Sequence, residues 1–319
     1  MKNYIACPYC YANNDCSDIN SKECLTINCG ECDEEIWEVI PPKSLLYESF
    51  YFVLNVLIYC TIIFISAQFF ITYPEWRNAA GFVFITSITI ASLSLHEFFH
   101  AFFAFIFGDF TVYRNRYLRL NILNYIDGAC SFMLPAILFM FTGIAEMGAA
   151  VYLRLEYVKS AILRSIVYLS GSFSQIIFLS IILHTINNEP LYFSEKFLPL
   201  LHVAAGIQLC ILIINLLPIP GLDGWNAIFC FLPLEDLNNF LSQNSIFFIL
   251  IFIFSLFYVD GFSTLLFSPV FDYMRLIGID ERLFFKGFSY IQIINFDTLE
   301  LIKERLIDLV FKTWAMLVS

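Results

Sequence analysis

The sequence predicts a polytopic α-helical membrane protein with a small cysteine-rich unit ahead of its first span. The chain is 59% hydrophobic and only 14% charged, whereas soluble domains are about 45–50% apolar and about 25% charged. Long uncharged runs recur along it, while residues 1–40 are polar and contain several cysteines. This composition predicts that the chain lies in a lipid bilayer. The net charge is −11 and no basic stripe is present, so we expect no nucleic acid as a partner.

Residues 1–40 are expected to form a zinc-ribbon-like domain. Cys7 and Cys10 make one CxxC pair, and Cys29 and Cys32 make a second. Two pairs at this separation are typical of a structural Zn²⁺ held by four thiolates. A domain of forty residues has a small hydrophobic core and needs such a metal ion for stability. The alternative is a disulfide-linked extracellular module, although paired CxxC motifs suit metal better. A thiolate site favours a reducing compartment, so we expect a cytosolic N-terminus.

Residues 41–77 are expected to contain a linker and the first membrane span. No charge occurs from 49 to 74, which is long enough to cross a hydrocarbon core of about 30 Å at about 1.5 Å per residue. A second span is predicted at about 78–107. Further uncharged runs lie at about 165–188, 197–222 and 237–259, with 262–285 as an additional candidate. The segment 297–317 is predicted to be an amphipathic helix on the membrane surface.

The second span carries the motif His96-Glu97-Phe98-Phe99-His100. In a helix, His96 and His100 share one face, where two imidazoles can bind one Zn²⁺. Glu97 lies one step round and can take a proton from the attacking water. Ionisable residues inside a membrane span are rare and usually functional. The alternative is a pair of histidines satisfied by helix neighbours, with Glu97 protonated.

The region after this span changes in character. Residues 109–127 are rich in β-prone residues and arginine, so we expect two short strands just outside the membrane. The apolar segment 128–145 is short and can either span or re-enter. If it re-enters, most basic residues of the chain lie on one side of the membrane. The positive-inside rule predicts that this side is the cytosol, and it therefore favours re-entry. The residues concerned are Lys43, Arg114, Arg116, Arg119, Arg154, Lys159 and Arg164.

A third zinc ligand is expected from Asp223. It follows a stretch in which Pro218, Pro220 and Gly221 break the helix, and broken backbone at membrane depth occurs where it lines a cavity or is buried in protein. Asp223 can then turn inward as a carboxylate ligand. His202 is the rival candidate, but it lies on the far half of its span.

The HEFFH motif followed by Asn215-Leu-Leu-Pro-Ile-Pro-Gly-Leu-Asp223-Gly resembles the site-2 protease family of intramembrane zinc metallopeptidases. The resemblance covers roughly residues 78–235, leaving 236–319 as a C-terminal span and tail. It implies a three-helix core, catalytic zinc held by His96, His100 and Asp223, and Glu97 as general base. It also implies cleavage of transmembrane segments of other proteins, and an enzyme of the cell (inner) membrane.

Substrate-binding residues are expected from the same resemblance. Asn215 matches a family asparagine that contacts substrate, while Gln175 replaces another and keeps a donor and an acceptor on a longer arm. A strand around Leu118 and Leu120 is expected to pair with the unwound substrate. Two alternative functions remain: a catalytically impaired member that binds transmembrane helices, and a zinc-handling membrane protein. The sequence predicts no particular oligomeric state.

Overall fold

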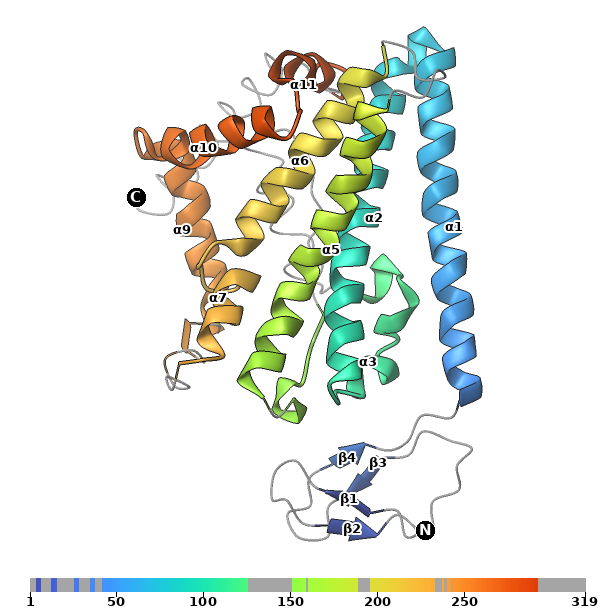
Figure 1. Cartoon of the computed structure of the whole chain (residues 1–319), viewed down its shortest axis with the longest axis vertical. Helices are drawn as coiled ribbons and strands as arrows, with labels where there is room; N and C mark the ends of the chain where they lie inside the picture. Colours follow the sequence, from blue (N-terminus) through green and yellow to red (C-terminus); the bar gives the residue numbers. More distant parts are fainter. Residues whose placement is uncertain are drawn as a thin grey trace, which may run out of the picture.

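The computed structural model describes residues 4–6, 13–15, 26–28, 35–37, 42–125, 151–158, 160–188, 196–232 and 243–291, with isolated positions between 237 and 241. Long helices dominate these residues and pack side by side as a bundle (Figure 1). They are α1 (Pro42–Thr72), α2 (Arg77–Ile106), α5 (Ala161–Asn187) and α6 (Leu198–Leu216). The chain runs up α1, down α2, up α5 and down α6 in the orientation of Figure 1.

Four helices in the described part of the chain are long and apolar enough to cross a membrane. They are Leu46–Thr72, Pro74–Ile106, Ala161–Asn187 and Leu198–Leu216, which matches the first, second, third and fourth predicted spans. Bilayer-length apolar segments form helices because every backbone polar group must be satisfied internally. The chain is therefore an integral membrane protein.

The two remaining predicted spans are shorter than expected. The run at 237–259 forms α9 (Ser245–Tyr258), whose 14 residues reach only about 21 Å at 1.5 Å each, short of the hydrocarbon core. The candidate 262–285 is wrong as a span, because it divides into α10 (Phe262–Leu276) and α11 (Glu281–Phe288) around a left-handed Gly278. Figure 1 shows α10 running across the bundle rather than along it.

The predicted hairpin after α2 is also wrong. The chain instead forms a short helix α3 (Thr111–Arg114) and two 3₁₀ turns, η2 (Tyr117–Arg119) and η3 (Ile122–Asn124). Arg116 and Leu120, which flank η2, have left-handed backbones with φ of 60° and 54°. Such residues interrupt an extended strand, so Leu118 and Leu120 do not lie on a strand edge.

The segment 126–150 lies outside the described residues, but its two flanks are placed. The carboxylate of Asp109, just after α2, accepts hydrogen bonds from the Thr111 hydroxyl and, at 2.8 Å, from the backbone N–H of Arg154. The chain before and after 126–150 is therefore joined at the end of the bundle where α2 ends and α5 begins. This agrees with the basic-residue argument, while re-entry of 128–145 itself stays a prediction.

The N-terminal residues contain four short strands in two antiparallel pairs. β1 (Tyr4–Ala6) pairs with β2 (Asn13–Asp15), and β3 (Thr26–Asn28) pairs with β4 (Glu35–Trp37). The four cysteines of the predicted ribbon, Cys7, Cys10, Cys29 and Cys32, lie outside the described residues, as does 297–317.

Two buried apolar clusters hold the bundle together. The larger one joins α1, α2, α5, α6 and α10, with Phe70, Phe197 and Leu200 fully buried. The smaller one lies around the second half of α2 and includes Ala101, Leu118 and Val167. The HEFFH motif sits where the smaller cluster begins.

Candidate metal centre and active site

Helix α2 places the three motif side chains inside the protein. His96, Glu97 and His100 are each 4–5% exposed, although they lie in a helix of otherwise apolar character. One helical turn separates the two histidines, and their Nε2 atoms are 2.9 Å apart. Both rings therefore point at the same spot, as the sequence predicted.

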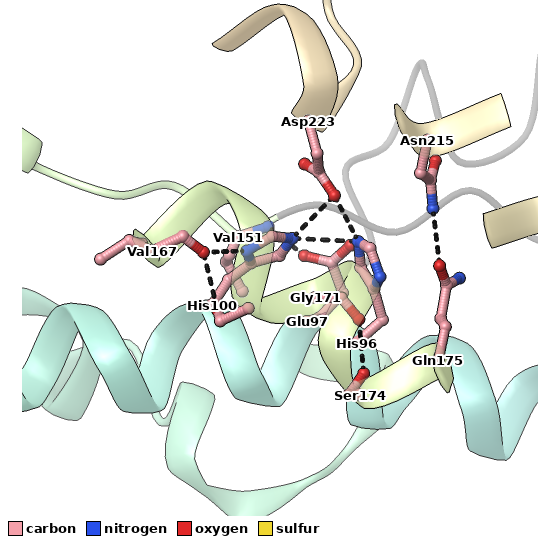
Figure 2. A network of polar contacts seen from close by, with 11 residues as sticks. His96, Glu97, His100, Val151, Val167, Gly171, Ser174, Gln175, Asn215 and Asp223 are labelled. Carbon is pink, nitrogen blue, oxygen red and sulfur yellow. Dashed lines mark hydrogen bonds and ion pairs between the residues drawn. The ribbon is translucent and has the colours of Figure 1, made fainter. Parts of the chain in front are cut away.

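Asp223 reaches this spot from another part of the chain. Helix α6 ends at Leu216, the backbone turns at Gly221 with φ of 97°, and α7 (Asp223–Phe229) begins at the aspartate. Asp223 Oδ2 lies 3.1 Å from His96 Nε2 and 3.3 Å from His100 Nε2 (Figure 2). The three ligand atoms lie within 4.8 Å of one another, and no other such group of histidine, cysteine and carboxylate side chains occurs in the described part of the chain.

The donor atoms of this group fit a bound cation. His100 Nδ1 donates to the carbonyl oxygen of Val167 at 2.8 Å, so in a neutral ring its Nε2 carries a lone pair directed at Asp223. Asp223 Oδ2 is buried and has no hydrogen-bond donor of its own among the described residues. Two imidazole nitrogens and one carboxylate oxygen that converge in this way suit Zn²⁺.

The hydrogen bond to Val167 also fixes the orientation of the His100 ring. Metal-bound histidines usually donate their second ring nitrogen to a carboxylate or carbonyl in this way. The Nδ1 atom of His96 is buried and has no hydrogen-bond partner among the described residues. The second ring nitrogen of His100 is therefore held by a hydrogen bond, whereas that of His96 has no such partner among the described residues.

Glu97 lies beside the metal ligands but is not one of them. Its Oε2 accepts a hydrogen bond from the backbone N–H of Val151 at 2.9 Å. Val151 begins an irregular segment that runs to Arg154, whose backbone N–H binds Asp109. Glu97 is thus held in place and available as a proton carrier.

Helix α5 approaches the histidines through Gly171. A Cβ at this position would overlap the imidazole rings of both His96 and His100. The hydroxyl of Ser174 donates to the Gly171 carbonyl at 2.7 Å within the helix. A glycine is needed here because the backbone of α5 forms one wall of the metal centre.

Two predicted substrate-binding residues meet one another. Asn215 Nδ2 lies 3.4 Å from Gln175 Oε1, joining α6 to α5 beside the metal ligands (Figure 2). Leu118 and Leu120 are 8% and 3% exposed and do not present an edge to a substrate. His202 lies elsewhere, where its Nδ1 accepts the backbone N–H of Asp280, so it is not a ligand of this site.

The backbone groups of Val151 and Val167 were not predicted from the sequence. Each contributes an N–H or a C=O, and neither valine side chain signals this contribution. The close approach of Gly171 to both histidines also has no local signature in the sequence.

Comparison with known proteins gives several relatives. The chain is 32% identical over 218 residues to a Mycobacterium tuberculosis protein named "Putative zinc metalloprotease Rip2", covering 66% of this chain and 81% of that protein. It is 36% identical over 153 residues to the Mycolicibacterium smegmatis protein of the same name, and spans only 56% of that protein's length. A Bacillus subtilis protein named "Putative zinc metalloprotease YwhC" is 28% identical over 146 residues, or 44% of this chain and 64% of that protein. No family model and no solved structure matches the chain.

Proposed function

Because the chain belongs to the site-2 protease family, we propose that it hydrolyses peptide bonds within or beside transmembrane segments of other membrane proteins. The observation that carries this proposal is the convergence of His96, His100 and Asp223, with Glu97 beside them, among membrane-spanning helices. Ionisable groups are costly there and mark a functional site.

The residues of the site divide the chemistry between them. Zinc bound here would supply Lewis acidity toward the scissile carbonyl and the attacking water. Glu97 takes the proton of that water and delivers it to the leaving amine. The Val151 N–H orients the Glu97 carboxylate, and Val167 orients His100.

The substrate must expose its backbone to reach Glu97, because a helix hides its carbonyls in its own hydrogen bonds. The backbone that contacts Glu97 is that of Val151, at the start of the irregular segment Val151–Arg154, in place of the strand expected around Leu118. Its side chains alternate: Val151 and Leu153 pack against the smaller apolar cluster, whereas Tyr152 is 60% exposed. We propose that this segment lies alongside the unwound substrate, with Asn215 and Gln175 as its polar contacts.

The central test is the Glu97→Gln substitution in purified protein reconstituted with a membrane protein substrate. Glutamine keeps the shape and the acceptor for the Val151 N–H but cannot carry the proton. We expect cleavage to fall roughly 10²–10⁴-fold while zinc content is unchanged. Glu75→Gln is the matched control, because Glu75 is exposed in the connection between α1 and α2.

The same experiment distinguishes the alternatives. Undiminished cleavage by the Glu97→Gln protein would refute the role of Glu97. No cleavage by the unaltered protein, together with retained substrate binding, would favour a catalytically impaired member of the family. Zinc transfer without cleavage would favour a zinc-handling protein.

The expected orientation places the N-terminus in the cytosol of an inner (cell) membrane. Of the basic residues that support it, those that the structure describes lie near the start of α1, near the start of α5 or just after α2, and these three points are at the same end of the bundle (Figure 1). Because lysine and arginine are enriched in cytosolic loops, we propose that this end faces the cytosol.

We also propose a structural zinc in residues 1–40. Ala6 of β1 pairs with Asn13 of β2, and Asn28 of β3 pairs with Glu35 of β4. In the sequence, the first strand of each pair is followed directly by a CxxC motif. The two motifs together supply the four thiolates of a structural zinc site.

Zinc stoichiometry tests the structural site. The unaltered protein should bind about two zinc ions, and replacement of Cys29 and Cys32 by serine should reduce this to about one. Unchanged stoichiometry in the double variant would contradict the structural site without affecting the catalytic one.

A further inference from the structure

One face of α1 carries polar side chains at membrane depth. Glu48, Asn55 and Tyr59 lie seven and four residues apart, which places them on the same side of the helix. Large apolar side chains such as Phe50 and Phe64 are exposed elsewhere on α1. The polar face contacts residues 116–122, called here the 116–122 turn, which includes η2 and lies between α1 and α2.

The first contact is an ion pair between Glu48 and Arg119. Arg119 Nε donates to Glu48 Oε2 at 2.8 Å, and Nη2 donates to Oε1 at 2.7 Å. The guanidinium carbon lies 4.7 Å from the ring centroid of Tyr51 and 5.4 Å from that of Tyr47. Two parallel hydrogen bonds and two aromatic faces fix both the position and the plane of the arginine.

The second set of contacts holds the backbone of the turn. Asn55 Nδ2 donates to the Arg119 carbonyl at 3.0 Å, and the Tyr59 hydroxyl donates to the Leu120 carbonyl at 3.3 Å. The backbone N–H of Ile122 donates back to the Tyr59 oxygen at 3.3 Å. Leu120 is left-handed with φ of 54°, a conformation that a leucine keeps only where its surroundings hold it.

Tyr59 also connects the turn to the catalytic helix. Its hydroxyl lies 2.9 Å from the Ser94 hydroxyl, and Ser94 precedes the ligand His96 by two residues on α2. A single phenol therefore joins α1, α2 and the 116–122 turn.

The turn forms part of the wall beside Glu97. Tyr117, Leu118 and the fully buried Tyr125 share the smaller apolar cluster with Ala101, one helical turn after Glu97. The Tyr125 hydroxyl donates to the Tyr117 carbonyl at 2.7 Å. Displacement of the turn would therefore change the surroundings of Glu97.

We propose that Glu48, Asn55 and Tyr59 form a clamp on α1 that fixes the 116–122 turn against α2 and thereby positions the wall beside Glu97. These are positioning residues, because none belongs to the metal-ligand group. The inference rests on the proposed protease function, in which Glu97 carries the proton. It assigns α1 a role in the reaction although α1 supplies no reacting group.

Kinetics of two clamp variants test the positioning role. Tyr59→Phe removes one hydroxyl, and Glu48→Gln removes the charge opposite Arg119. We expect kcat to fall roughly 10- to 100-fold with KM within about twofold and zinc content unchanged, because misplacement of this size near a catalytic group is costly. Thr61→Val is the matched control, since the Thr61 hydroxyl bonds only to Leu57 of its own helix.

A double variant tests whether the ion pair acts as a unit. Glu48→Gln, Arg119→Gln and the combined variant should lower kcat by similar factors, because either single change already removes the pair. A combined loss equal to the product of the two single losses would contradict the clamp.

Hydrogen exchange gives a readout that does not require activity. Amides of residues 116–122 should exchange at least about tenfold faster in Tyr59→Phe and Glu48→Gln than in the unaltered protein and Thr61→Val. Unchanged exchange would overturn the clamp, and faster exchange with unaltered kcat would overturn its positioning role. If the unaltered protein cleaves nothing, the proposed protease function fails, and the exchange rates still decide whether the clamp exists.

Discussion

Gly171→Ala should remove zinc from the catalytic site while leaving the helices intact. The added Cβ would lie 2.5 Å from His96 Cε1 and 2.6 Å from His100 Cε1, where ordinary van der Waals contact begins at 3.4 Å. His100 Nε2 would be closer still, so one or both rings must retreat by about 1 Å. Ligand distances in zinc sites fall within about 0.2 Å of their usual values, so a shift of this size takes a ring out of range.

The expected loss can be estimated from this displacement. Perturbing groups that merely orient metal ligands costs about 10- to 100-fold in affinity, and here the ligands themselves move. We expect zinc affinity to fall at least about 100-fold, or about 2.7 kcal/mol, and cleavage to fall with it. Alanine is favoured over glycine inside a helix by about 1 kcal/mol, so α5 itself should not unfold.

Zinc affinity is best measured by competition with a chelator. The measurement uses a Cys29→Ser, Cys32→Ser background, which removes the proposed structural zinc site and leaves the catalytic site as the one measured. Gly206→Ala serves as the control, because its Cβ would be similarly crowded, but by the ring of Phe284 between α6 and α11. This control should keep its zinc. Unaltered zinc affinity in Gly171→Ala, with helical content maintained, would refute the proposed packing of α5 against the histidines.

Three further outcomes follow from the structure. Asp223→Ala in the same background should lower zinc occupancy, and full occupancy would show that another residue is the third ligand. Single cysteines placed at Arg116 and Lys159 should both be labelled from the cytosolic side, whereas labelling from opposite sides would show that 128–145 spans the membrane. Asp109→Asn should lower the free energy of unfolding by about 1–3 kcal/mol, because an amide N–H₂ would face the backbone N–H of Thr111 or Arg154. Thermal or denaturant unfolding measures this change, and a stability equal to that of the unaltered protein would mean that the carboxylate does not hold the end of α2 to the segment around Arg154.

Features with a local signature could be predicted from the sequence. The four long spans follow from uncharged runs of bilayer length, since only a helix satisfies its own backbone there. The spacing of His96 and His100 places them on one face of any helix. The change of backbone after Asn215 correctly indicated that Asp223 could turn toward them.

The 116–122 turn shows where this reasoning fails. Its residues are β-prone and were expected to form strands, yet they form 3₁₀ turns with a left-handed Leu120. Contacts from Glu48, Asn55 and Tyr59, some sixty to seventy residues earlier in the chain, favour this conformation over local propensity. Propensity describes neighbours in sequence and does not include such contacts.

The sequence by itself determined the membrane class, the four long spans and the candidate metal ligands, because hydropathy, periodicity and side-chain chemistry are properties of the residues themselves. Only the tertiary structure decided what orients those ligands. The Val151 N–H that holds Glu97 and the Val167 carbonyl that holds His100 are backbone groups, and every residue other than proline carries the same two. Their roles depend on where the folded chain places them, and the same holds for Gly171, whose missing Cβ matters only because two imidazole rings occupy that space.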